Sequence, residues 1–419
     1  MRKRLEILFV LMLFSATAML AQMTTSGING MVTAGGDKAI GATVTAVHEP
    51  SGTTYNTVVN ESGRYSINGM RVGGPYTVKV SYIGYTTSVT KDVTLQLAES
   101  YSLNVKLAED ANELGEVVVS AKATKFTAER TGASTNINLR QLENMPTVSR
   151  SITDFTRLSP YGGNGMSFAG TDGRTANFTV DGANFNNNFG LSDGLPGGGN
   201  PISIDAIEEM QVVISPYDVR QTNFIGGGVN AITKSGTNTF KGTAYIYHQN
   251  ENMRGDAIER EQISGAREKD QKTTYGFTLG GPIIKNKLFF FVSGEMSKTP
   301  TVVNRWRGSV DGVADADNYI SRTTLADLEK VSNFVKDKYG YDTGSWTNFP
   351  ADENNYKLLA RLDWNITNMH HLSFRYNYTK NRNWNPTNAS SMDGGTRSAY
   401  GRFSQMSMSY ANSMYALDN

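Results

Sequence analysis

The chain has 419 residues, with 40 Lys plus Arg against 39 Asp plus Glu, and it contains no cysteine. The near balance of charge gives no support to a nucleic-acid-binding protein, which would need a basic surplus. The lack of cysteine excludes disulfides, thiolate metal sites and a lipoprotein anchor, and the length predicts more than one domain.

Residues 1–21 have the pattern of a secretory signal peptide. A basic segment, 2–4, precedes an apolar segment, 7–14, and small residues follow, with cleavage expected after Ala18 or Ala21. The apolar run is too short to span a bilayer as a helix. No later segment has 18 consecutive apolar residues, so we expect no transmembrane helix in the mature chain.

Residues 22–108 read as short strands separated by turn signals every eight to twelve residues, which predicts a small β-sandwich. Four motifs resemble those of the carboxypeptidase regulatory-like domain: GA-x-V at 41–44, GRYSI at 63–67, PYTV at 75–78 and GY at 84–85. The resemblance implies a transthyretin-like sandwich without catalytic residues of its own.

The linker 109–135 is polar except for one β-prone run, Glu116, Val117, Val118 and Val119. An exposed extended segment in a linker suits strand pairing with a partner. The alternative is that the run forms the last strand of the preceding sandwich.

Residues 136–236 mix short strands and turns with many Gly and Asn, which predicts a loop-rich α+β unit. We expect a turn at Asp181-Gly182 and, over 203–215, a short helix followed by a strand. Such a unit is either a soluble domain or a plug inside a pore. Four aromatic residues in it could stack on a ligand, or could equally be its own packing residues: Tyr161, Phe168, Phe185 and Phe189.

Residues 237–419 alternate apolar and polar side chains, the period of a strand with one apolar face. Runs of about ten residues are long enough to cross a bilayer as tilted strands. We expect strands within 239–248, 275–280, 288–294, 356–366 and 372–379, long links at 252–272 and 297–354, and a helix at 324–338. A hairpin of a soluble β-sandwich would show the same alternation.

The two faces of these strands can be assigned if they form a barrel. A lysine or arginine on the lipid face near mid-membrane costs about 2–4 kcal/mol. Lys357, Arg361 and Arg375 are therefore expected to face the lumen. The outer face is expected to carry Tyr275, Phe277, Leu358, Leu362, Trp364 and Phe374.

In this order, these parts resemble a TonB-dependent outer-membrane transporter. The resemblance rests on the sandwich, the Glu-Val-Val-Val run, the plug wording TDGRT at 171–175 and FTVDGA at 178–183, GGG-x-N-x-IT at 226–233, and GGPIIKNKLFFF at 280–291. The plug motifs and the motif of this last hairpin resemble the Oar-like branch of the family more than its SusC-like branch.

The resemblance implies a mainly β protein of the bacterial outer membrane, with a sandwich, an α+β plug and transmembrane β-barrel strands. It also implies import of an unidentified ligand, no bond chemistry and no cofactor. The partners would be TonB, binding at Glu116 to Val119, and outer-membrane lipid. Such barrels have 22 strands, which at about ten residues each need roughly 220 residues before any loop is counted. Residues 239–419 are too few, so we expect 237–419 to be the N-terminal part of a truncated barrel, with five or six strands. A cell-surface adhesion or structural protein is the alternative.

A secreted zinc peptidase is a weaker reading. His248 and Glu251 spell H-x-x-E and His370 lies downstream. However, His248 ends a predicted strand, Glu251 begins a loop, and His370 lies in a predicted turn. We therefore expect no metal site and no catalytic residue.

Overall fold

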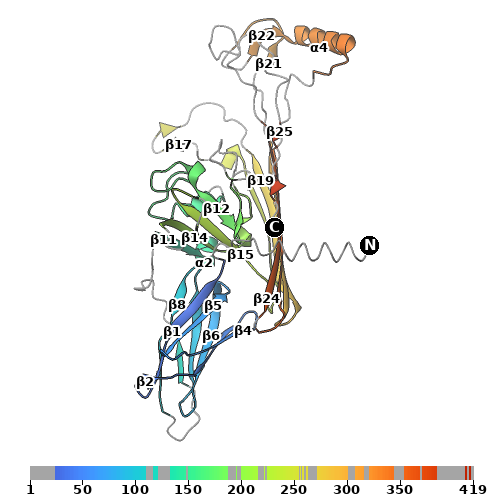
Figure 1. The fold of residues 1–419 in the computed structure, drawn as a ribbon. Coiled ribbons are helices and arrows are strands. Elements are labelled where there is room, and N and C mark those ends of the chain that lie inside the picture. The colour runs from blue at the N-terminus through green and yellow to red at the C-terminus, as the bar shows by residue number, and fades with distance from the viewer. Residues whose placement is uncertain are drawn as a thin grey trace.

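In the computed structural model, three β-structures follow one another along the chain, and a small outer unit extends from the third (Figure 1). Among the described residues, no helix is long and apolar enough to cross a membrane. The structure describes residues 24–109, 117–120, 133–147, 150–186, 195, 200–215, 221, 224–253, 255, 257–258, 261–262, 271–300, 307–315, 320–343, 353–368, 370–384, 411–412 and 415–416.

The first structure is the predicted sandwich, built from two sheets that enclose one apolar core. In both sheets the alternate residues point inward, as in β3, where Val44 and Ala46 are fully buried. One sheet holds β1 (Ser26–Ala34), β2 (Asp37–Lys38), β5 (Arg64–Met70), β8 (Ser100–Ser102) and β9 (Val105–Leu107). The other, in order, holds β10 (Val117–Ser120), β7 (Ser88–Leu95), β6 (Gly73–Ser81), β3 (Thr43–His48) and β4 (Thr53–Val58).

The second structure, which we call the plug, is a mixed sheet with short helices around it. Its strands lie in the order β11 (Ala133–Asn138), β14 (Ile207–Ser215), β15 (Gly228–Thr233), β12 (Asn177–Val180) and β13 (Ala183–Asn184). Its helices are α2 (Leu139–Asn144), α3 (Ile152–Thr156), η2 (Gly173–Thr175) and η3 (Ile204–Ala206). The helix predicted before β14 is therefore only a 3-10 turn.

Asp181 and Gly182 form the predicted turn between β12 and β13. Both residues have positive φ, 49° and 87°, and Val180 faces Ala183 across the hairpin. This geometry suits a two-residue hairpin, and Asp and Gly are among the residues that tolerate it. The turn presents the Asp181 side chain at the end of the hairpin.

The third structure, which we call the wall, has five long strands, each antiparallel to the next. They are β16 (Lys241–Gln249), β19 (Lys272–Ile284), β20 (Leu288–Thr299), β23 (Glu353–Asn365) and β24 (His371–Trp384). Short segments β25 (Ala411–Asn412) and β26 (Tyr415–Ala416) pair with β24.

Four of the wall strands, β19, β20, β23 and β24, are longer than predicted. Residues 281–284 were expected in a link, but they continue β19, with a register shift between Pro282 and Ile284. Proline cannot donate to the ladder, and an irregularity of this kind accommodates it without ending the strand.

The two faces of the wall differ as predicted. The six expected outer residues are 41–57% exposed, and Tyr356 and Ile366 are 39% and 47% exposed. Lys357 and Arg361 are buried, and Arg375 points toward the plug, where it meets Asp181. The wall therefore has an apolar outer face and an inner face that carries charge.

The outer unit lies within the second long link. It holds β21 (Arg307–Ser309), β22 (Ile320–Thr324) and the predicted helix, α4 (Leu325–Tyr339). Thr324 caps the helix by accepting from the Asp327 amide, and Gly340 ends it with φ 66°. The first long link contains η4 (Glu251–Met253), β17 (Ala257–Ile258) and β18 (Glu261–Gln262).

Candidate functional site: the plug–wall interface

The plug meets the wall where two arginines oppose each other. Arg361 on β23 and Arg375 on β24 are register partners, so two cations face each other on neighbouring strands of the inner face. Like charges in this position repel and destabilise a sheet. An anion must lie between them for the arrangement to be stable.

Asp181 from the plug turn supplies that anion. Its carboxylate lies 3.8 Å from Arg361 Nη1 and 3.4 Å from Arg375 Nε, and its side chain is 1% exposed. The Thr233 amide and hydroxyl donate to the same carboxylate over 3.0 and 2.5 Å. Arg361 Nη1 in turn donates to the Thr233 carbonyl over 2.6 Å. The plug is thus fastened to the wall through a closed polar network.

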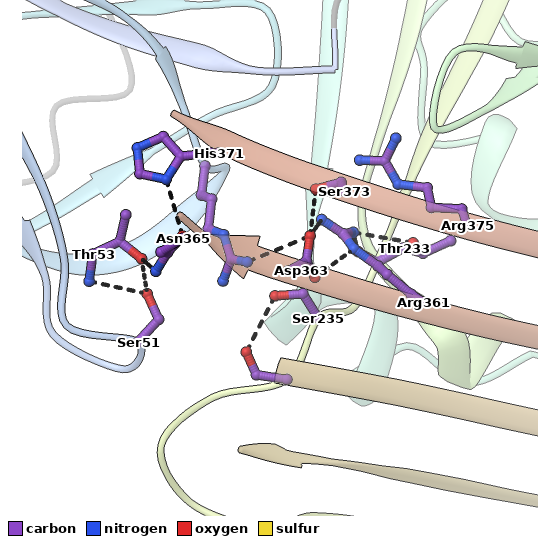
Figure 2. A network of polar contacts seen from close by, with 12 residues as sticks. Ser51, Thr53, Thr233, Ser235, Arg361, Asp363, Asn365, His371, Ser373 and Arg375 are labelled. Atoms are coloured by element: carbon purple, nitrogen blue, oxygen red, sulfur yellow. Dashed lines mark hydrogen bonds and ion pairs between the residues drawn. The ribbon is translucent and has the colours of Figure 1, made fainter. Parts of the chain in front are cut away.

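Asp363 holds Arg361 from the other side. Arg361 Nε and Nη2 donate to its two carboxylate oxygens over 2.8 and 3.1 Å, and the Ser373 hydroxyl donates over 2.5 Å. Figure 2 shows these residues between β23 and β24, with Thr233 reaching Arg361 from the plug. A fork of this kind fixes the guanidinium in one orientation.

The sandwich joins the same network. Arg71 Nη2 lies 3.4 Å from Asp363 Oδ1, and its guanidinium lies over the Phe289 ring. Nearby, the Asn365 side-chain amide donates to the Thr53 hydroxyl over 2.9 Å, so the start of β4 in the sandwich contacts the end of β23 in the wall (Figure 2). Asp363 is therefore shared by a wall arginine and a sandwich arginine.

His48 begins the sandwich loop that leads to this contact. Its Nδ1 lies 2.6 Å from the Ser51 hydroxyl, and its ring packs against Tyr76. Burial, assisted by the Arg71 charge, lowers the pKa of His48 to about 3. The imidazole is therefore neutral at neutral pH, and it contacts Ser51 and Tyr76 without carrying a charge.

A second set of plug–wall contacts follows one row of register partners across the wall. The row runs through Tyr245, Gly276, Glu295, Lys357 and Thr379. The Tyr245 hydroxyl donates to Glu295 Oε2 over 2.8 Å, and Lys357 Nζ donates to Glu295 Oε1 over 2.7 Å. The Tyr245 ring can cross to Glu295 only because position 276 is glycine, where a Cβ would lie 2.1 Å from that ring.

The plug segment 200–205 sits on this row. The Ser203 hydroxyl contacts both the Tyr245 hydroxyl, at 2.9 Å, and Glu295 Oε2, at 3.0 Å. The Thr379 hydroxyl donates to the Pro201 carbonyl over 2.5 Å. Arg150 pairs with Asp205 and lies over the Tyr245 and Tyr247 rings.

Beside this row, a cavity of about 540 Å³ separates the plug from the wall. Charges of both signs line it, among them Arg150, Asp205, Lys272, Glu295 and Glu353. Its lining is mainly polar. The interface is built to hold two bodies together through many separate polar contacts.

Comparison with known proteins identifies these parts. Residues 27–108 match the carboxypeptidase regulatory-like domain, and residues 232–310 match an outer membrane beta barrel domain. The TonB-dependent transporter Oar of Myxococcus xanthus is 25% identical over 347 residues, which cover 77% of this chain and 30% of Oar. The chain is a homologue of the TonB-dependent transporter Oar.

Solved structures of siderophore and ferric enterobactin receptors are also similar to this chain. The siderophore receptor PirA from Acinetobacter baumannii is 19% identical, with a TM-score of 0.40, over 68% of this chain and 37% of PirA. A ferric enterobactin receptor from Pseudomonas aeruginosa is 16% identical, with a TM-score of 0.38, over 61% of this chain and 34% of that receptor.

The barrel match and the similarity to Oar place the protein in the bacterial outer membrane. Its wall is part of an outer-membrane β-barrel. The chain spans about a third of the length of the curated relative that it matches.

The run predicted to bind TonB is extended in the structure. Val117, Val118 and Val119 lie in β10, which pairs in parallel with β7 of the sandwich, and Glu116 lies outside the described residues. This is the position that the alternative reading anticipated, as a last strand of the sandwich. Binding to TonB stays a prediction.

The four aromatic residues predicted at a ligand site have different surroundings. Phe168 and Phe185 belong to the plug core, 0% and 3% exposed, and so offer no surface for stacking in this structure. Tyr161 is 52% exposed, and Phe189 lies outside the described residues. The sequence had left the packing role open for all four.

His248 of the zinc-peptidase reading contacts the Thr273 hydroxyl at 2.9 Å. Over the described part of the chain, no three His, Asp or Glu side chains gather to hold a metal ion. Reasoning from the sequence missed the Asp181–Arg361–Arg375 network, although it had assigned both arginines to the lumen.

Proposed function

We propose that the protein takes part in TonB-dependent import of a ligand across the outer membrane, with the plug displaced when TonB pulls on the linker. The observation that carries the proposal is Asp181 bridging two opposed arginines of the wall. The wall by itself is electrostatically unfavourable there, and the plug that completes it is held by non-covalent contacts that a pull on the linker could break. The relationship to Oar supports the same conclusion.

The order of strands in the plug indicates how a force on the linker would be transmitted to the plug–wall contact. The linker enters the plug at β11, an edge strand that pairs antiparallel with β14. β14 pairs with β15, which ends at Thr233, the residue that contacts Arg361. Force applied to the linker therefore reaches first an edge strand and then, two strands on, the contact that holds the plug to the wall.

A test in cells can follow the plug without knowledge of the ligand. Ser203→Cys places the only cysteine of the chain at a buried plug–wall contact. Maleimide should label it in energised cells and much less in cells treated with a protonophore. Val118→Pro, which removes a backbone donor from the TonB segment, should reduce labelling to the protonophore level, while Val118→Ala should not.

Labelling that depends neither on energy nor on Val118→Pro would contradict the proposal. In that case the sandwich and the outer unit would be better explained by the alternative, a cell-surface adhesion protein. Such a protein needs neither a movable plug nor a pulled linker.

A further inference from the structure

β10 is the outermost strand of its sheet. Its residues pair in register with β7, Val118 opposite Val89 and Ser120 opposite Lys91, and the sheet order is β10-β7-β6-β3-β4. Within the described ranges, no strand pairs with the other edge of β10. We propose that TonB adds its strand to this outer edge while β10 stays on β7, so that the sandwich is part of the TonB-binding site. This inference rests on the proposed function.

The two edges of a strand make this possible. A β-strand has hydrogen-bonding groups on both sides, and an open sheet edge accepts a further strand through main-chain bonds. If TonB took β10 away, the β10–β7 bonds would be lost. Addition to the outer edge keeps those bonds and gains the new ones.

The sandwich also makes a direct connection to the plug beyond the end of β7. The Leu97 amide donates to Glu209 Oε1 over 2.9 Å, and the Leu97 carbonyl accepts from Gln211 Nε2 over 3.0 Å and from Asn136 Nδ2 over 3.3 Å. Asn136 lies on β11, and the other two lie on β14. A load on β10 would thus reach the same two plug strands by two routes, the linker and the Leu97 contacts.

A load on the sandwich would also act on the wall. Arg71 lies 3.4 Å from Asp363, the carboxylate that holds Arg361. Moving the sandwich away from the wall withdraws Arg71 from that carboxylate. The sandwich, the plug and the wall are therefore loaded together when TonB holds the sandwich edge.

A disulfide between β10 and β7 separates the two modes of binding. The chain has no cysteine, so Val89→Cys with Val118→Cys, register partners in the parallel pair, introduces a single possible bridge. The whole protein in outer-membrane fractions would be assayed for binding of the purified periplasmic domain of TonB. We expect the oxidised variant to bind within about twofold of its reduced form.

The result that would overturn the inference is loss of TonB binding on oxidation, restored by reduction. A second measurement does not depend on the bridge. Hydrogen exchange of the β7 amides, residues 88–91, should stay slow in the complex, whereas exchange that becomes fast on TonB binding would show that β10 has been taken away. If the unaltered protein does not bind TonB at all, the proposed function itself is wrong.

Discussion

Asp181→Asn tests whether the plug is held to the wall by the bridge between two arginines. The substitution keeps the shape of the side chain and removes its charge. Asp181 has a φ of 49°, and asparagine tolerates this left-handed region at least as well as aspartate. The backbone of the turn is therefore not strained by the change, and the effect reports the lost charge.

The magnitude follows from the burial of the three groups. Removing one partner of a buried ion pair costs about 3–5 kcal/mol, because the remaining charge is left without compensation. Arg361 retains Asp363, and Arg375 is 22% exposed and can be hydrated. We therefore expect the lower end, about 3 kcal/mol, which corresponds to roughly a 100-fold change in the opening equilibrium of the plug.

Hydrogen exchange of the plug amides in the whole protein measures this equilibrium. Exchange of β12 and β15, residues 177–180 and 228–233, should become about 100-fold faster in Asp181→Asn. The matched control is Asp172→Asn, which removes a plug carboxylate paired with Arg174 at an exposed site. It should leave the exchange of these strands unchanged. Equal exchange in the two variants would refute the role assigned to Asp181.

Three further predictions concern the contacts around this network. Between pH 6.5 and about 3 the unfolded chain holds a proton on His48 that the folded sandwich does not. The free energy of unfolding should therefore fall by about 2 kcal/mol from pH 7 to pH 5. His48→Gln, measured by denaturant unfolding, should lack this loss. Gly276→Ala should displace the Tyr245 ring and speed plug exchange more than Tyr245→Phe, which removes only the hydroxyl. Glu209→Ala leaves the buried Leu97 amide without its acceptor and should weaken sandwich–plug association by about 1–3 kcal/mol. The weakening should appear as faster proteolytic release of the sandwich. An unchanged release rate would show that the Leu97 contacts do not transmit force from the sandwich to the plug.

The architecture could be predicted because the alternation of apolar and polar residues within a strand shows which side chains lie on each face of the sheet. In the wall, alternation placed Leu358 and Leu362 outside and Lys357 and Arg361 inside, and the structure has them there. This information is local, since the side-chain period of a strand is two and the cost of a charge in lipid is high. The turn at Asp181-Gly182 is likewise encoded by adjacent residues.

Contacts between distant segments could not be predicted in the same way. β10 showed a β-prone run, but the partner of an isolated strand is set by which sheet edge is open, and that depends on the whole sandwich. Phe168 and Phe185 showed aromatic character, which serves equally for packing and for ligand stacking. Their burial depends on strands that lie far away in the sequence.

The plug–wall network could have been anticipated in part from the charges of the wall strands. Arg361 and Arg375 were both assigned to the lumen, and a hairpin turn near 366–370 makes them neighbours on adjacent strands. Two opposed cations on one face are unfavourable unless an anion approaches from elsewhere. The wall sequence thus implies a carboxylate on whatever fills the lumen, and an acidic residue at a plug turn that faces the wall can supply it. Asp181 fulfils that requirement from the turn of a hairpin whose first strand, β12, packs into the plug core.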